Sequence, residues 1–130
     1  MTGLTRSLAE FVHSPGLDTL PERALSIAQS GFIDTIATMI AGRHEPVVGM
    51  VTRFVASRGA SAREATLLAG TDRAASADAA LINGTAGHAL DFDDVAMGGH
   101  PSTVLVPTVL AEAEALGLGD ADAVRAYLVG

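Results

Sequence analysis

Cysteine, lysine and tryptophan are absent from this chain of 130 residues. Without cysteine the chain forms no disulfide bond and has no thiolate to serve as a nucleophile or a metal ligand. Aromatic residues make up only 4% of the sequence, whereas 48% of the residues are hydrophobic. The core therefore has to be built from alanine, leucine, valine and isoleucine, a composition that favours closely packed helices.

Positive charge is scarce, above all in the second half of the chain. The net charge is −7, and all cationic side chains are arginines. The segment from Ala74 to Val124 contains no arginine, but it carries carboxylates at Asp78, Asp91, Asp93, Asp94, Glu112, Glu114, Asp120 and Asp122. A nucleic-acid surface needs clustered cations, so this charge pattern argues against a nucleic-acid partner. An anionic ligand bound by this segment would need positive charge from elsewhere.

Long apolar runs are also missing. A membrane-spanning helix needs about 18 uninterrupted apolar residues. The richest stretch, Ala24 to Gly42, is interrupted by polar residues such as Gln29 and Asp34. The N-terminal residues lack the continuous apolar core of a secretion signal. We therefore expect a cytoplasmic protein with no membrane partner.

The hydrophobic pattern predicts an all-α fold. Helices are predicted over residues 5–12, 20–42, 45–57, 76–90 and 102–116, with a last helix that Asp120 caps. In the second of these, Thr19 and Glu22 have the spacing of a capping box, Pro21 falls in the first turn and Gly42 ends the helix. Its apolar stripe is wide enough that we expect burial on more than one side.

Three shorter signals refine this prediction. Residues 64–69 resemble a strand but are too short and isolated to imply a sheet. Gly84 and Gly87 lower helix propensity, so we expect them to permit the close approach of a neighbouring helix. Pro107 either kinks its helix or marks the true first turn. The last helix ends at Gly130 with an unfinished apolar face, which favours a truncated domain.

Two imidazoles and three carboxylates lie close together in the sequence: His88, Asp91, Asp93, Asp94 and His100. If the helix continues to Asp91, that carboxylate shares a helix face with His88. Gly98 and Gly99 provide a turn directly before His100, at the start of the next helix. The positive end of that helix dipole disfavours imidazolium, so the neutral ring is able to accept a proton.

The segment from Asn83 to Asp94 (NGTAGHALDFDD), followed by Gly99 to Ser102 (GHPS), resembles the signature of the MmgE/PrpD family. The similarity to that family extends to three further places: residues 8–12, residues 20–22 at the start of the long helix, and Asp34 with Thr35 inside that helix. The resemblance implies a cofactor-independent, homodimeric enzyme of several hundred residues, with a large helical domain and a smaller α+β lid domain. Residues 1–130 would then be the N-terminal part of the helical domain, with the lid domain and the remainder absent.

The same resemblance implies roles for three residues. Asp91 and His100 match active-site positions: His100 would transfer a proton or contact the substrate, and Asp91 would orient the site. His88 is a candidate substrate-binding residue. The family commonly has threonine where this chain has Val95. The implied function is that of a lyase acting on a small polycarboxylic acid, most similar to 2-methylcitrate dehydratase, with no metal and no cofactor. Cis-aconitate decarboxylase belongs to the same family.

Two other classes of function stay open. A metal-dependent hydrolase would use His88, Asp91, Asp93, Asp94 and His100 as ligands. A non-catalytic helical dimerisation module would need none of them. Each residue also has a structural interpretation: the acidic run as a solvated loop in which Asp93 and Asp94 cap or position backbone, His88 as a favourable charge at a helix C-terminus, and His100 as a turn residue.

Overall fold

A computed structural model describes residues 3–14, 21–59, 61–68, 70, 72–96 and 98–130. Its elements are α1 (Leu4–Val12), α2 (Glu22–Gly42), α3 (Pro46–Ser57), β1 (Ala65–Thr66), β2 (Arg73–Ala74), α4 (Ser76–His88), α5 (Pro101–Leu116) and α6 (Asp120–Val129). Of the residues that the structure describes, 69% are helical, which confirms the all-α prediction. Thr19, the predicted cap of α2, lies outside the described residues, and α2 begins at Glu22 with Pro21 in the N-cap position.

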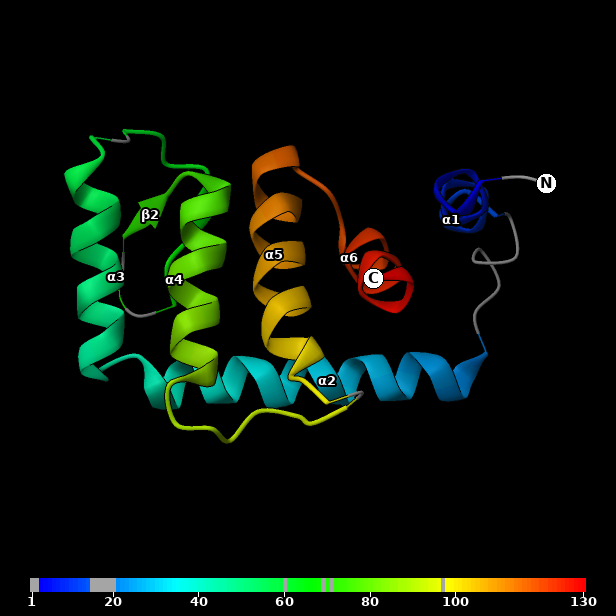
Figure 1. Ribbon diagram of the computed structural model, residues 1–130, viewed down its shortest axis with the longest axis horizontal. Coiled ribbons are helices and arrows are strands. Elements are labelled where there is room, and N and C mark those ends of the chain that lie inside the picture. The colour runs from blue at the N-terminus through cyan, green and yellow to red at the C-terminus, as the bar shows by residue number, and fades with distance from the viewer. Residues whose placement is uncertain (1–2, 15–20, 60, 69, 71, 97) are drawn as a thin grey trace.

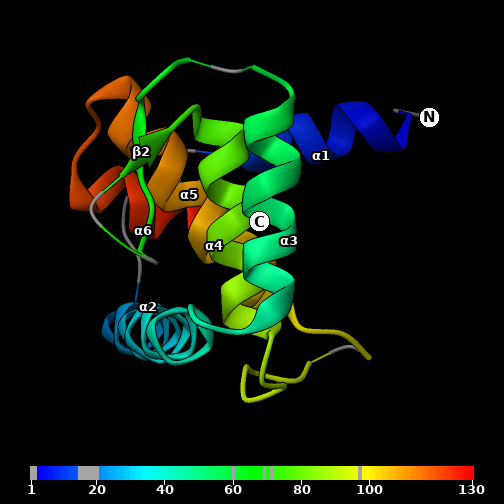
Figure 2. The ribbon, with the colours of Figure 1, turned by 90° about the vertical axis from the view of Figure 1, so that its left-hand side faces the viewer.

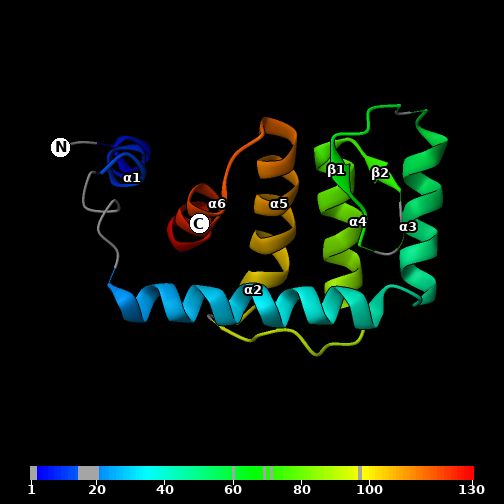
Figure 3. The ribbon, with the colours of Figure 1, turned by 180° about the vertical axis from the view of Figure 1, so that it is seen from behind.

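Three helices stand side by side across a fourth. Figure 1 shows α3, α4 and α5 in a row, with α2 running along one end of α4 and α5 and on past α6, and Figure 3 shows the same arrangement from behind. Seen from the side in Figure 2, α2 lies below the row of helices, and the small sheet lies beside α4 and α5. Helix α6 lies beyond α5, and α4 has its most extensive contacts with α5 and α2. Helix α4 is therefore the centre of the fold.

Glycines allow α4 to approach its neighbours closely. A β-carbon added at Gly87 would lie 2.6 Å from the hydroxyl oxygen of Thr103, and one at Gly84 would lie 3.1 Å from the carbonyl oxygen of Thr103. A β-carbon at Gly42 would collide with the carbonyl oxygen of Ala86. The prediction that the glycines of α4 permit close helix packing is confirmed. Gly42 does end α2, and it also makes room for α4.

The core is aliphatic and small, as the composition predicts. Its largest members include Met39, Ile82 and Val106, each at most 1% exposed. Ile82 packs with Val48 and Val55 of α3. The expectation that α2 is buried on more than one side is wrong for the described residues, because Ile33 is 71% exposed.

The short sheet corrects a second expectation. Strands β1 and β2 pair in antiparallel fashion, with Ala65 opposite Ala74 and Thr66 opposite Arg73, so the strand-like segment does form a sheet. The buried side chain of Asn83 ties this hairpin to α4. Its Oδ1 accepts a hydrogen bond from the backbone N–H of Leu68 at 3.0 Å, and its Nδ2 donates to the carbonyl of Thr66 at 2.9 Å.

The remaining helix ends agree with the sequence in part. Pro107 lies inside α5 and is buried, so it does not mark a first turn, and Gly117 ends α5 with a φ of +67°. Asp120 is the first residue of α6, and Gly119 holds the cap position without a side-chain hydrogen bond. Helix α2 is long and apolar enough to cross a membrane, but core helices of soluble proteins can be equally long and apolar.

Candidate active site

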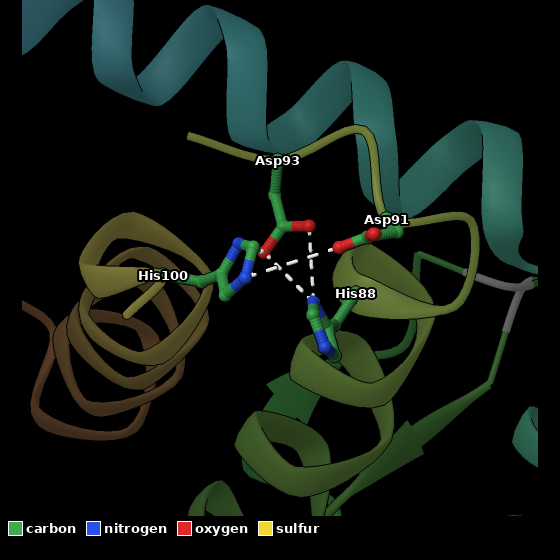
Figure 4. Close-up of side chains that lie close together, drawn as sticks. All are labelled: His88, Asp91, Asp93 and His100. Atoms are coloured by element: carbon green, nitrogen blue, oxygen red, sulfur yellow. Dashed lines mark hydrogen bonds and ion pairs between the residues drawn. The ribbon is translucent and has the colours of Figure 1, made fainter. Parts of the chain in front are cut away.

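The three residues that the sequence singles out lie together, between the end of α4 and the start of α5. His88 is the last residue of α4, and His100 occupies the N-cap position of α5. Figure 4 shows both rings with Asp91 and Asp93, which come from the loop between the two helices. The ring centroids of His88 and His100 are 4.6 Å apart. Two helix ends and one loop therefore build a single cluster.

Asp93 lies at the centre of this cluster. Its side chain is 0% exposed, and its two carboxylate oxygens lie 3.0 and 3.1 Å from Nδ1 of His88. One of these oxygens, Oδ2, is also 3.3 Å from Nδ1 of His100. The alternative that Asp93 only caps or positions backbone is therefore not what the structure shows. Nothing in the spacing of the acidic run indicates which carboxylate turns inward, so sequence reasoning missed this contact.

Asp91 faces His100 from the solvent side. Its Oδ1 lies 3.8 Å from Nε2 of His100, and its side chain is 79% exposed. The helix does not continue to Asp91, because α4 ends at His88, so the two residues do not share a helix face. The backbone then turns, with the N–H of Asp91 donating to the carbonyl of His88 at 3.0 Å and Asp91 itself at a φ of +55°. Aspartate tolerates this left-handed conformation better than most residues do.

Asp94 fixes the start of α5. Its Oδ1 accepts a hydrogen bond from the backbone N–H of Ser102 at 3.1 Å, and its Oδ2 accepts one from the hydroxyl of Ser102 at 2.7 Å. The Ser102 hydroxyl also lies 2.8 Å from the hydroxyl of Tyr127 on α6. A carboxylate at a helix N-terminus is favourable both as a cap and toward the helix dipole. The structure agrees with the capping role considered for Asp94. Through Ser102, Asp94 holds the start of the helix whose N-cap is His100.

A groove of about 560 Å³ runs between α4 and α5 from the two imidazoles. The other described residues that line it are Ala80, Leu81, Gly84, Thr85, Thr103, Val104, Pro107 and Thr108. No arginine is among these lining residues. A ligand with several carboxylates would therefore meet imidazoles, hydroxyls and apolar groups here, and its negative charge would need to be balanced by groups outside this groove.

The cluster has the composition of an acid–base site and also of a metal site. Imidazole is the side chain whose ordinary pKa suits proton transfer near neutral pH. Each of His88, Asp91, Asp93 and His100 offers one ligand atom, and these atoms lie within 4.8 Å of one another. The two Nδ1 atoms, however, both face the Asp93 carboxylate. This arrangement orients the rings without any ion.

The fold and the site together define a helical domain with paired imidazoles and carboxylates beside a groove. A comparison with known protein families matches residues 6–130 to the MmgE/PrpD N-terminal domain. The chain therefore belongs to the MmgE/PrpD family, which is broadly one of dehydratase-like lyases. A search of curated proteins finds no match. The family prediction made from the motif is confirmed.

Proposed function

We propose that this chain contributes the acid–base side chains of a cofactor-independent lyase acting on a small polycarboxylic acid, most similar to 2-methylcitrate dehydratase. The observation that carries the proposal is the cluster of His88, Asp91, Asp93 and His100, whose two imidazoles line the groove between α4 and α5. Membership of a dehydratase-like family supports the same reaction class.

Dehydration of a hydroxy acid needs two proton transfers. A base removes a carbon-bound proton, the C–H electrons form the double bond, and an acid protonates the hydroxyl as it leaves as water. We assign proton transfer to His100, its support to Asp91 and substrate contact to His88. His100 is suited to this role because its side chain is 29% exposed and makes no capping hydrogen bond to α5.

The substrate carboxylates and the developing negative charge need cations or N–H donors. Because the described lining of the groove contains no arginine, we propose that residues 1–130 work as the N-terminal part of a larger helical domain that a lid domain completes. We also propose a homodimer, as the family resemblance implies, and a cytoplasmic location. The large apolar side chains that stay exposed on α2 and α3, such as Ile33 and Phe54, support burial against another surface.

The test is the turnover of 2-methylcitrate by the protein that contains this chain, with and without His100→Ala. Because a positioned acid or base contributes about 10² to 10⁴-fold, we expect turnover to fall at least about 10²-fold. His13→Ala is the matched control, since His13 is exposed at the end of α1. Unchanged turnover in His100→Ala would reject the assignment.

A metal-dependent hydrolase is the second candidate, and the clustering of four possible ligands within 4.8 Å favours it. Imidazole and carboxylate together suit several divalent metals. The two proposals differ in metal content. The hydrolase requires stoichiometric metal and loses activity with a chelator, whereas the lyase keeps its turnover after chelation and dialysis.

A non-catalytic dimerisation module is the remaining alternative. The exposed apolar residues of α1, including Leu4 and Leu8, are compatible with it. This alternative requires a stable dimer that binds no polycarboxylate. It also requires that replacing Asp91 and His100 changes neither the structure nor any measurable activity, which is the opposite of what the lyase predicts.

A further inference from the structure

We infer that Asp93 is a positioning residue whose buried carboxylate accepts hydrogen bonds from Nδ1–H of both His88 and His100. It thereby holds both neutral rings in the Nδ1–H tautomer and leaves their Nε2 atoms as proton acceptors. The catalytic consequence rests on the proposed lyase function, but the tautomers do not depend on it.

The first step of the argument is the burial of Asp93. An ionised carboxylate removed from water needs hydrogen-bond donors, because burying an unpaired charge is costly. The described structure offers the Asp93 side chain the two imidazole Nδ1 atoms, at 3.0 to 3.1 Å for His88 and 3.3 Å for His100. A neutral imidazole donates from one nitrogen alone. The Asp93 carboxylate is therefore satisfied only when that nitrogen is Nδ1 in both rings.

The second step concerns His100. Its Nδ1 atom is covered from solvent and has no partner that meets strict hydrogen-bond geometry. The oxygen Oδ2 of Asp93, at 3.3 Å, is a carboxylate beside it. A hydrogen bond from Nδ1–H of His100 to this oxygen would satisfy a buried donor that is otherwise left without a partner. One carboxylate then fixes the proton positions of two rings.

The third step concerns the second ring nitrogen, Nε2, which carries no proton in the Nδ1–H tautomer. In a neutral ring the hydrogen bond made by one nitrogen sets the chemistry of the other. Nε2 of His100 faces Asp91 at 3.8 Å. The second nitrogen of His88 points away from Asp93 in Figure 4, and His88, which is 52% exposed, lines the groove. Both acceptor nitrogens are thus directed away from the carboxylate that orients them.

The experiment is long-range ¹H–¹⁵N NMR of the chain labelled with ¹⁵N-histidine, recorded about two pH units above the ordinary imidazole pKa of roughly 6.5. The chain has four histidines, and the exposed His13 serves as the internal reference. We expect the Nδ1–H pattern for His88 and His100 in the wild-type protein. The Nε2–H pattern in both rings would overturn the inference without any variant.

Asp93→Asn tests the same contact by an isosteric change. An asparagine side chain has one acceptor oxygen and one donor NH₂ group. Because both carboxylate oxygens of Asp93 lie 3.0 to 3.1 Å from Nδ1 of His88, the NH₂ group of an asparagine would face that Nδ1–H in either orientation. We expect at least one of the two rings to switch to Nε2–H, whereas Asp91→Asn leaves His88 in the Nδ1–H form. Asp72→Asn, at an exposed carboxylate, is the matched control. Unchanged tautomers in Asp93→Asn would contradict the inference.

Turnover separates this inference from the proposed function. In a functional lyase, Asp93→Asn should lower kcat by about 10²-fold with little change in KM, because a ring in the wrong tautomer cannot accept the proton. Nδ1–H tautomers in a protein without lyase activity would sustain the positioning role and reject the lyase. Lyase activity with Nε2–H tautomers would reject the positioning role and keep the lyase.

Discussion

At the scale of single residues, three neighbouring carboxylates do three different things. Asp91 is exposed and faces His100, Asp93 is buried between two imidazoles, and Asp94 caps α5 through Ser102. The sequence predicts that such residues gather near His88 and His100, because a short loop keeps them close. It does not predict their individual roles, since the direction of each side chain depends on a backbone turn with a positive φ at Asp91.

The cap at α5 gives a first stability prediction. In Asp94→Ala the backbone N–H and the hydroxyl of Ser102 lose their acceptor, so we expect the free energy of unfolding to fall by about 0.5 to 2 kcal/mol. Urea denaturation followed by circular dichroism measures this change. Asp72→Ala is the control, because the contact that the described structure gives the Asp72 side chain is an exposed ion pair of 3.8 Å with Arg63. Equal midpoints for the two variants would contradict the capping role.

At the scale of elements, the helices are largely predictable and the sheet is not. The periodic apolar residues and the stops at Gly42 and Gly117 place the helices to within a few residues. Strand β2 carries no signal of its own, because its two residues become a strand only by pairing with β1, which Asn83 ties to α4 through Thr66. The exposed side of α2 also escapes prediction, since apolar residues there indicate burial that the described chain does not provide.

Close packing of α2 on α4 gives a second stability prediction. Gly42→Ala would press a β-carbon against the carbonyl oxygen of Ala86, so we expect a loss of about 1 to 3 kcal/mol in the free energy of unfolding. Gly49→Ala is the control, and we expect it to change the free energy of unfolding in the opposite direction. A β-carbon there has space in α3, so the change should stabilise the helix by about 0.5 to 1 kcal/mol. A stabilised Gly42→Ala variant would refute the packing argument.

The contact between α4 and the hairpin gives a third prediction. Asn83→Ala removes an acceptor for the N–H of Leu68 and a donor for the carbonyl of Thr66. We expect the free energy of unfolding to fall by about 1 to 3 kcal/mol and the Leu68 amide to exchange faster with solvent. Hydrogen exchange followed by NMR measures both effects. Protection of Leu68 equal to that in the wild type would show that the hairpin does not depend on Asn83.

At the scale of the whole molecule, two features suggest that further protein completes this domain: exposed apolar surface on α2 and a groove without arginine among its described lining residues. Ile33 and Ile40 lie seven residues apart on one face of α2 and are 71% and 44% exposed. The groove beside His88 and His100 has no arginine among its described lining residues. Both features are expected of a helical domain whose surface and active site are completed by further protein, which is the assembly we propose.

The proposed homodimer can be tested on that face of α2. If Ile33 and Ile40 lie in the interface, the double variant Ile33→Glu/Ile40→Glu should be a monomer in sedimentation velocity, at a concentration where the wild-type protein is a dimer. Buried carboxylates without partners would oppose association. Ala121→Glu, at an exposed position on α6, should leave the dimer intact. A dimeric double variant would exclude this face from the interface.

The most direct test of the central claim is a double-mutant cycle on turnover of 2-methylcitrate, with Asp91→Asn, His100→Ala and the two combined. If His100 moves the proton and Asp91 acts through it, the double variant should be no slower than His100→Ala alone. Losses that multiply would mean that the two residues act independently, and that result would contradict the account.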